Sequence, residues 1–287
     1  MVSLAGVQPG LWAVHDGNDK VSEALLKESG ATLRKSLVMS VELNSTTSGP
    51  RETFKVHSVP WQQTYEESQK HPKDLVEYDV VIVAMPQHGA PMSQHPVNFA
   101  GFDDPSKSSN IPKGPFPGDY RRTVANFVSG TPRAETFGLK NGKSLPDSII
   151  TISEPELRFR SLAKNFPVDT TAEEAETKDI YVYKVFASDI LSKEQLDALF
   201  LEYSEVKNCD WLAYPYYGTT DTIPPFELYP GVYYVNGIEW AASAVEMSVI
   251  GSRNVALLAH QYWAGQRSND SVDGDGDRPK PDDKTEL

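Results

Sequence analysis

The residues best placed to do chemistry lie in one stretch, 231–263, which reads GVYYVNGIEWAASAVEMSVIGSRNVALLAHQYW. Its β-branched and aromatic beginning, Val232–Val235, predicts a strand, and Asn236-Gly237 predicts a break after it. From about Ala242, small and apolar residues predict a helix that is buried on most sides. A turn that leads into a helix presents unpaired N–H groups and the positive end of the helix dipole, which favour a phosphate or an electron-rich carbonyl oxygen. An ordinary strand-turn-helix packing unit has the same pattern, so the pattern alone leaves both interpretations open.

A family resemblance rests on the same residues. Gly237-Ile238-Glu239, followed by AASAVEMS at 241–248, resembles the C-terminal flavin-binding segment of amine-oxidase-like FAD enzymes, in the form found in the prenylcysteine oxidase (prenylcysteine lyase) family. The segments LWAV at 11–14, WLAYP at 211–215 and KTEL at 284–287 are also similar to that family. The resemblance therefore extends over nearly the whole chain.

The resemblance implies a set of residues that bind FAD. The implied cofactor-binding residues are Val38, Ala84, Glu239, Val245, Glu246 and Met247. Of these, Glu239 would lie near the ribityl and phosphate part of the cofactor, and the three amides from 245 to 247 near the isoalloxazine ring. The backbone of Val38 would lie beside the adenine.

The activity implied by the resemblance is thioether oxidation. A flavin would take hydride from the carbon next to the sulfur of farnesyl or geranylgeranyl cysteine, and water would add there. The product of this addition would break down to cysteine and a prenyl aldehyde, and dioxygen would reoxidise the flavin to give hydrogen peroxide. The implied biological role is the breakdown of prenylated proteins. No side chain in the sequence identifies itself as a catalytic acid or base. If the reaction needs one, Glu239 and Glu246 are the nearest candidates by motif, although a structural or ribityl-binding role explains both better.

Two other functions remain open on the sequence. One is a catalytically silent lipid-binding relative, and the other is an FAD-linked oxidase of another apolar amine or thioether. The chain contains no GxGxxG, the turn whose backbone and helix N-terminus hold the pyrophosphate of FAD. The sequence thus resembles the family without its N-terminal βαβ unit. We therefore expect weak FAD binding and an open groove flanked by Val38, Ala84 and Glu246.

A dense set of rings between 211 and 234 predicts the substrate site. The residues expected to contact the isoprenoid tail of the substrate are Trp211, Tyr217 and Tyr233. An apolar slot would dominate affinity for such a tail, because each buried CH₂ is worth about 0.8 kcal/mol. Ordinary core packing of these aromatic rings is the alternative.

Composition excludes several other functions. The net charge of −13 disfavours binding to nucleic-acid phosphates, and no apolar run reaches the roughly 18 residues of a membrane span. The single Cys209 cannot form an intrachain disulfide. His88 and His95 lack the spacing of metal ligands, so we expect solvated histidines and no metal site.

Residues 1–30 show no signal peptide, although the family resemblance implies a lysosomal protein. Asn44 and Asn269 begin Asn-X-Ser/Thr triplets, which are weak glycosylation motifs that apply only on the secretory route.

The elements that must position these residues follow from periodicity. Helices are expected at 19–27, capped by Asn18 or Asp19, and after the capping box that begins at Ser192. The apolar residues at helical spacing in the second helix are Leu196, Leu199, Phe200 and Tyr203. The strands are expected at 36–44, 54–59, 79–86, 123–128, 148–152 and 180–186. We expect the apolar run 79–86 to be covered on both faces. The family resemblance further implies that Val80–Ala84 and Val232–Val235 are neighbouring elements of one flavin-side layer.

These elements predict a mixed α/β flavin-oxidase fold of the FAD/NAD(P)-binding type, with a strand-rich substrate domain. The expected segments are a partial FAD-binding domain at 1–86, the substrate domain at 87–230, the C-terminal FAD-binding segment at 231–268 and a flexible acidic tail at 269–287. Between 87 and 113 the sequence predicts a long loop.

Overall fold

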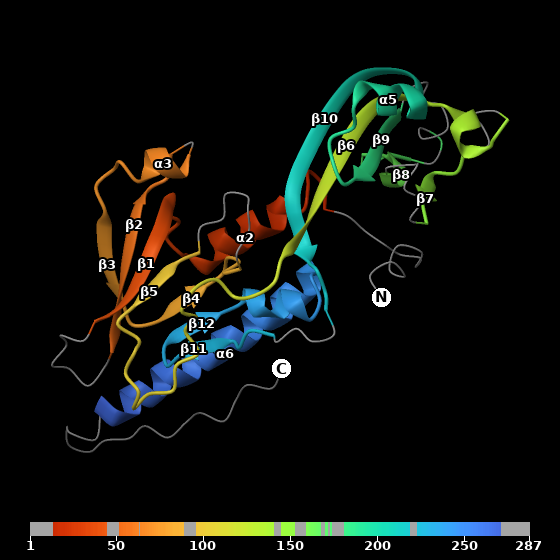
Figure 1. Cartoon of the computed structure of the whole chain (residues 1–287). Helices are drawn as coiled ribbons and strands as arrows, with labels where there is room; N and C mark the ends of the chain where they lie inside the picture. The colour runs from red at the N-terminus through yellow and green to blue at the C-terminus, as the bar shows by residue number, and fades with distance from the viewer. Residues whose placement is uncertain are drawn as a thin grey trace, which may run out of the picture. The chain divides into compact units, whose positions relative to one another are not determined.

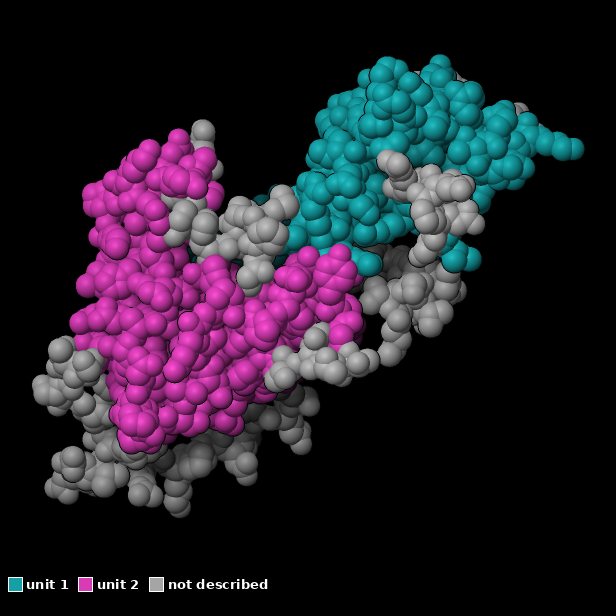
Figure 2. Space-filling model, viewed as in Figure 1, with its two compact units in different colours: residues 1–34, 121–213 teal, residues 35–120, 214–287 magenta. Residues whose placement is uncertain are grey.

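The computed structural model describes residues 14–44, 52–62, 64–88, 96–140, 145–152, 159–167, 170–171, 173, 181–218 and 223–270. The fold is mixed α/β, as predicted, and has several separate sheets (Figure 1). The chain divides into two compact units, coloured separately in Figure 2. Unit 1 contains residues 1–34 and 121–213, and unit 2 contains residues 35–120 and 214–287.

The units do not divide where the sequence analysis placed its segment boundaries. Residues 87–120, expected in the substrate domain, belong to unit 2 because hydrogen bonds and a short strand hold them there. The backbone N–H of Asn110 donates to Leu228 O at 2.7 Å, and that of Gln87 donates to the Tyr234 hydroxyl at 3.2 Å. The expected loop 87–113 also contains β5 (Asn98–Ala100), which pairs in parallel with β1. The functional roles assigned to the segments stay predictions.

The larger sheet of unit 2 contains four strands in the order β3-β2-β1-β5. Its first three members are β1 (Ser36–Asn44), β2 (Thr53–Pro60) and β3 (Asp74–Tyr78), and they pair antiparallel. The strands predicted at 36–44 and 54–59 are confirmed, and the alternation of β1 turns Val41 and Leu43 into the core. Sequence analysis missed β3, an edge strand that leaves Leu75 and Tyr78 largely exposed.

The smaller sheet of unit 2 joins two segments that are far apart in the sequence. It contains β11 (Glu227–Tyr229), β12 (Val232–Tyr234) and β4 (Val81–Val83) in the order β11-β12-β4. β12 and β4 run parallel, with Val232 opposite Val81 and Tyr234 opposite Val83. The predicted pairing of these two runs in one layer is therefore confirmed.

The environment predicted for the apolar run 79–86 is wrong. The strand is limited to Val81–Val83 and lies at an edge of its sheet, with β12 on one side. Ile82 is 46% exposed, whereas Val83 is buried. Apolar composition did not imply two covered faces here, because an edge strand that turns one side chain inward still needs an apolar residue there.

The segment after β12 also differs from expectation. Asn236-Gly237 does not form a glycine turn but begins a 3₁₀ helix, η3 (Asn236–Trp240), after which α6 (Val245–Asp270) starts. Gly237 is needed because a Cβ there would lie 2.6 Å from Pro224 O. Helix α6 is not buried on most sides: Val255 is buried, while Val245, Val249 and Leu257 are each more than half exposed.

Unit 1 is built on a five-stranded antiparallel sheet in the order β10-β6-β9-β8-β7. Its strands are β6 (Tyr120–Pro132), β7 (Ser148–Ile150), β8 (Phe159–Asn165), β9 (Tyr181–Ala187) and β10 (Phe200–Pro215). The strands predicted at 123–128, 148–152 and 180–186 correspond to β6, β7 and β9. Sequence analysis missed β8 and β10.

The helices of unit 1 confirm the predicted capping signals in part. Helix α5 (Lys193–Leu199) begins at the capping box between Ser192 and Gln195 and buries Leu196 and Leu199 against the sheet. It is shorter than predicted, because Phe200 is already extended and, with Tyr203, belongs to β10. Helix α2 (Asp19–Ser29) ends at Gly30 as predicted, but Asn18 makes no side-chain capping bond and the helix buries no residue. Two short elements complete the fold, α3 (Tyr65–Ser68) in unit 2 and η1 (Ala134–Phe137) in unit 1.

The tight turn between β11 and β12 requires glycine. Gly231 has a φ of 87°, and a Cβ there would lie 2.8 Å from Phe54 Cε2. We expect Gly231→Ala to lower the free energy of unfolding by about 2 to 4 kcal/mol, through backbone strain and overpacking. Gly114→Ala is the control, since nothing lies within 4 Å of its Cβ position, and it should change stability by less than about 1 kcal/mol. Denaturant unfolding measures both, and equal costs would contradict this account.

Candidate functional site

The parallel pairing of β4 and β12 brings two connecting segments to one edge of the sheet. Residues 84–88 follow β4 and η3 follows β12, so both leave from the carboxyl ends of their strands. The backbone N–H of Val235 donates to Val83 O at 3.0 Å, and that of Gln87 donates to the Tyr234 hydroxyl at 3.2 Å. Ligands of open α/β sheets bind outside such carboxyl ends. This edge is therefore a candidate functional site.

A carboxylate with both oxygens held lies at this edge. The Tyr120 hydroxyl donates to Glu239 Oε2 at 2.6 Å, and Asn236 Nδ2 donates to Glu239 Oε1 at 3.0 Å. Glu239 itself is half-buried. Burial and the nearby Glu239 carboxylate raise the pKa of Tyr120 above its usual value, which keeps the phenol protonated and donating. Residues His88, Phe116, Tyr120, Asn236, Glu239 and Trp240 are called the Glu239 cluster below.

His88 lies in the aromatic part of the Glu239 cluster. Its ring stacks on Trp240 with 4.2 Å between centroids and meets Tyr120 edge-on at 5.8 Å. Phe116 lies at a ring distance of 5.6 Å. His88 is 1% exposed, and this burial lowers its pKa to about 4. The imidazole is therefore neutral at neutral pH.

The expectation of a solvated His88 is wrong. Sequence analysis treated it as a loop histidine, but His88 pairs with Phe116 through an isolated β-bridge and is enclosed by rings. Its position directly after the apolar run 79–86 was the signal that could have indicated burial. His95, the other histidine considered, lies outside the described residues.

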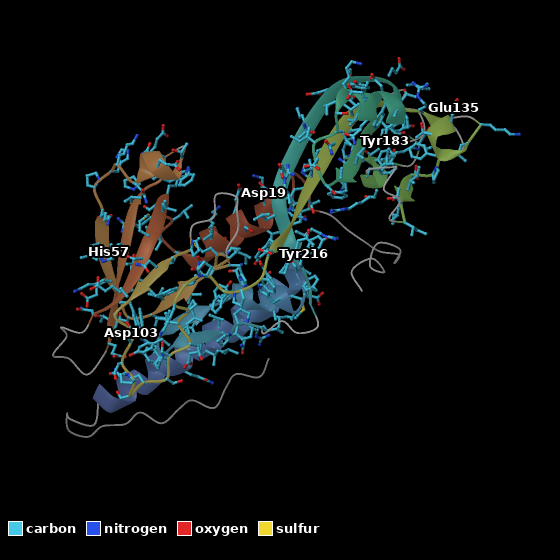
Figure 3. The ribbon with its side chains drawn as sticks, in the orientation of Figure 1. Asp19, His57, Asp103, Glu135, Tyr183 and Tyr216 are labelled. Carbon is cyan, nitrogen blue, oxygen red and sulfur yellow. The ribbon has the colours of Figure 1, made fainter. Side chains whose placement is uncertain are left out.

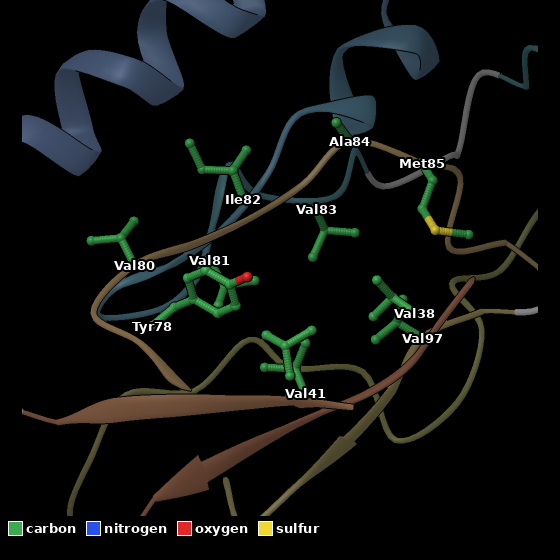
Figure 4. Close-up of a pocket in the computed structure, with 11 residues that line it drawn as sticks. Val38, Val41, Tyr78, Val80, Val81, Ile82, Val83, Ala84, Met85 and Val97 are labelled. Carbon is green, nitrogen blue, oxygen red and sulfur yellow. The ribbon is translucent and has the colours of Figure 1, made fainter. Parts of the chain in front are cut away.

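A second feature of unit 2 is an apolar pocket beside β4 (Figure 4). Its volume is about 420 Å³, and its lining residues are Val38, Val41, Val56, Tyr78, Val80, Val81, Ile82, Val83, Ala84, Met85 and Val97. The pocket brings together Val38 and Ala84, two residues predicted to bind the cofactor. Its aliphatic walls suit a flat ring or a hydrocarbon chain and offer few side-chain hydrogen bonds.

The other predicted cofactor residues lie elsewhere in unit 2. Glu239 belongs to the Glu239 cluster, and Val245, Glu246 and Met247 form the first turn of α6. Val245 is 75% exposed, Glu246 is exposed and Met247 is half-buried. None of these four lines the apolar pocket. Of the three residues expected to flank a groove, Val38 and Ala84 line this pocket and Glu246 does not.

The three predicted substrate residues have different environments. Trp211 lies on β10 in unit 1, with its ring 6.2 Å from Phe186. Tyr233 is buried beneath α6, where its hydroxyl donates to Leu258 O at 3.3 Å. This position favours the alternative of core packing for Tyr233.

Tyr217 occupies a surface position near the beginning of α6. It is 52% exposed, its ring stacks on Tyr214 at 6.3 Å, and its hydroxyl accepts the backbone N–H of Ser243 at 2.9 Å. Its neighbour Tyr216 follows the end of β10 and is equally exposed (Figure 3). Tyr217 thus connects the segment after β10 to the segment that leads into α6.

The structure describes the asparagine side chain of one glycosylation motif and not that of the other. Asn44 is 6% exposed, and its Nδ2 donates to Thr53 Oγ1 at 3.1 Å and to Glu77 Oε1 at 3.0 Å. A glycan would replace one of the two hydrogens on this buried nitrogen and so break at least one of these bonds, which means that the fold disfavours modification at Asn44. Asn269 falls in the last turn of α6, where the structure does not describe side chains. Residues 271–287, most of the predicted acidic tail, lie outside the described residues.

Comparison with known proteins gives the family. The family model for prenylcysteine lyase matches residues 1–274. The chain belongs to the prenylcysteine lyase family. Among similar proteins, prenylcysteine oxidase 1 of Bos taurus is 35% identical over 269 residues, which is 92% of this chain and 49% of the relative.

Further relatives of the prenylcysteine lyase family give the same picture. Prenylcysteine oxidase 1 of Homo sapiens is 34% identical over 288 residues, covering 100% of this chain and 53% of the relative. Prenylcysteine oxidase 1-like of Mus musculus is 32% identical over 264 residues, covering 91% and 50%. The chain spans about half the length of the curated relatives it matches. The predicted resemblance is confirmed.

The prenylcysteine lyase family is flavin-dependent, and the residues present fit parts of a flavin. The apolar pocket offers aliphatic walls for a ring, and the Glu239 cluster offers a fixed carboxylate beside buried polar atoms that make no hydrogen bond within the described part of the chain. The sequence provides no GxGxxG for the pyrophosphate. The fit is thus to the ring and the polar chain rather than to the diphosphate.

Two further properties bear on partners. Among the helices that the structure describes, none combines the length and apolar character needed to cross a membrane. Within the same residues, no three His, Cys, Asp or Glu side chains come together as metal ligands would.

The buried neutral His88 predicts a pH dependence of stability. Its pKa is about 4 in the folded chain and near 6.5 when unfolded, so between these values the unfolded state binds more protons. Stability from this group is complete above pH 6.5 and is lost as the pH falls toward 4, by on the order of 3 kcal/mol. Denaturant unfolding at pH 7 and pH 4.5 should show this loss in the native chain and its absence in His88→Phe. The same pH dependence in both proteins would show that His88 does not carry it.

Proposed function

We propose that the chain forms part of a flavin-dependent thioether oxidase that cleaves prenylcysteine. The observation that carries the proposal is the membership of the prenylcysteine lyase family, whose match covers residues 1–274. The Glu239 cluster supports it, because its carboxylate is held at the carboxyl edge of the parallel pair β4–β12. In the overall reaction, prenylcysteine, dioxygen and water give cysteine, a prenyl aldehyde and hydrogen peroxide.

The residues of this chain would bind and orient rather than react. A bound FAD supplies the acceptance of hydride and the reoxidation by dioxygen. Glu239 would accept hydrogen bonds from the polar chain of the cofactor, with Tyr120 and Asn236 fixing its carboxylate. Val38 and Ala84, which share the apolar pocket, would pack against the rings and exclude water. Val245, Glu246 and Met247 would present the first amides of α6, where unpaired N–H groups stabilise negative charge.

The finer assignments are proposals of the same kind. The substrate is farnesyl or geranylgeranyl cysteine, contacted by Trp211 and Tyr217, and the setting is the lysosomal breakdown of prenylated proteins. N-linked glycosylation at Asn269 is proposed for the same lysosomal setting. A catalytically silent lipid-binding relative is the second candidate, favoured by the missing GxGxxG.

Flavin and peroxide measurements test the proposal. Purified without added cofactor, the chain should carry little flavin, because the pyrophosphate turn is missing. With excess FAD, farnesylcysteine should release hydrogen peroxide and free cysteine, whereas a long-chain amine should not. Glu239→Gln, which removes the carboxylate charge and keeps the size, should weaken FAD binding. No peroxide at saturating FAD would favour the lipid-binding relative, and a chain isolated with stoichiometric flavin would contradict the expected weak affinity.

Prenyl chain length tests the substrate residues. Trp211→Ala or Tyr217→Ala should lower kcat/KM for geranylgeranyl cysteine about fivefold more than for farnesyl cysteine, because the longer tail buries more hydrocarbon. Tyr216→Ala is the matched control with the same exposure, 52%. Tyr233→Ala should instead reduce stability by about 3 to 5 kcal/mol, as expected for a buried ring, with little change in the ratio. An unchanged ratio in both Trp211→Ala and Tyr217→Ala would remove them from the substrate site.

A further inference from the structure

The unmet hydrogen bonds of unit 2 are concentrated in one place. Of the described residues of this unit, those with buried side-chain nitrogen or oxygen atoms that make no hydrogen bond are His88, Asn236 and Trp240. All three belong to the Glu239 cluster. Folded proteins leave few buried polar atoms unsatisfied, and a group of them around one carboxylate points to a ligand that completes their bonds.

The chemistry of these atoms limits the ligand. Asn236 Oδ1 can only accept a hydrogen bond, and Trp240 Nε1 can only donate one. Trp240 Nε1 lies close to the Tyr120 hydroxyl but without the geometry of a hydrogen bond. His88, neutral because burial lowers its pKa to about 4, has one donating and one accepting ring nitrogen. The ligand must therefore both donate and accept.

Hydroxyl groups meet this requirement better than ions do. A phosphate or carboxylate can only accept and would face the negative charge of Glu239, while an ammonium group can only donate. Each hydroxyl donates once and accepts twice, so hydroxyls on neighbouring carbons could satisfy Asn236, His88 and Trp240 and still donate to Glu239.

We propose that His88, Asn236 and Trp240 form, with Glu239, a binding site for a chain of hydroxyl groups of the ribityl type. The choice of a ribityl chain over other polyols rests on the proposed flavin-dependent function. The inference extends the cofactor site from Glu239 to three residues that the family resemblance did not indicate. It also gives a physical reason for His88: its ring is stacked on Trp240 while both nitrogens are kept for a ligand.

Two flavins that differ in this chain test the site directly. Riboflavin carries the ribityl chain, whereas lumiflavin has the same ring system with a methyl group in its place. We expect the full chain to bind riboflavin roughly tenfold more tightly than lumiflavin, measured by equilibrium dialysis. His88→Phe and Asn236→Leu should each reduce this ratio to about two, because each removes ribityl contacts and leaves the ring contacts in place.

A matched histidine variant provides the control. His57 lies on β2 in the same unit, 3.3 Å from Glu42 and outside the Glu239 cluster (Figure 3). His57→Phe should keep the riboflavin to lumiflavin ratio of the native chain. Equal affinity for the two flavins in the native chain would overturn the polyol site while leaving the flavin-dependent function standing. Binding of neither compound would overturn both.

Stability separates ligand binding from a merely structural role. His88→Phe keeps a ring on Trp240 and removes two buried nitrogens without partners, so the ligand-free variant should have the same thermal midpoint as the native chain or a higher one. A hidden structural hydrogen bond at His88 predicts the opposite. A lowered midpoint together with an unchanged flavin ratio would overturn the assignment of His88.

Discussion

The parallel pairing of β4 with β12 is the interaction on which the described features of unit 2 depend. It joins segments at 81–83 and 232–234, which lie far apart in the sequence, and so places the connections that follow them at one edge. His88 reaches Trp240, and Gln87 reaches Tyr234, only because these strands share a direction. The apolar pocket depends on the same contact, since residues 80–85, which contain β4, supply six of its eleven lining residues. A parallel pair cannot be closed by a hairpin, so the intervening chain is free to form a separate unit.

The Glu239 cluster combines stabilising contacts with buried polar atoms that make no hydrogen bond within the described residues. Stacking of His88 on Trp240 and the bonds from Tyr120 and Asn236 fix the carboxylate, which stabilises one arrangement of the edge. The same arrangement leaves buried nitrogen and oxygen atoms without partners in the described chain, and each such group costs about 1 to 3 kcal/mol. Cores built only for stability avoid this cost, whereas binding sites retain it because a ligand repays it with hydrogen bonds.

Local patterns in the sequence predicted the local structure well. The bounds predicted at 36–44 match β1, and the capping box at Ser192 begins α5. The predicted alternation does not hold throughout β1, because the register shifts between Val38 and Ser40 and both Val38 and Val41 line the apolar pocket. The pairing of 79–86 with 232–235 was also correct, but it came from the family resemblance and not from periodicity. Sequence analysis missed β3 and β8 and judged His88 wrongly, because exposure depends on which elements fold over a segment. Asn236 was likewise treated as a turn residue and Trp240 was given no role, since partners such as Tyr120 are far away in the chain.

The exposure of the first turns of α6 was not predicted for the same reason. Exposure depends on tertiary contacts, which local composition does not show. Its valine, isoleucine, leucine and alanine residues led to the expectation of a buried helix, yet Val245, Val249 and Ile250 are each at least half exposed. One side of the helix is fixed by Val255 and by the bond from Tyr233 to Leu258 O, which anchors it to β12. Val245, Val249 and Ile250 leave half or more of their surface exposed, so they contribute less to packing within the described chain. At about 25 cal/mol per Å², burial of that surface would add to stability, but local composition does not specify which element covers it. The helix thus has one side set by the fold and another whose exposure its composition does not predict.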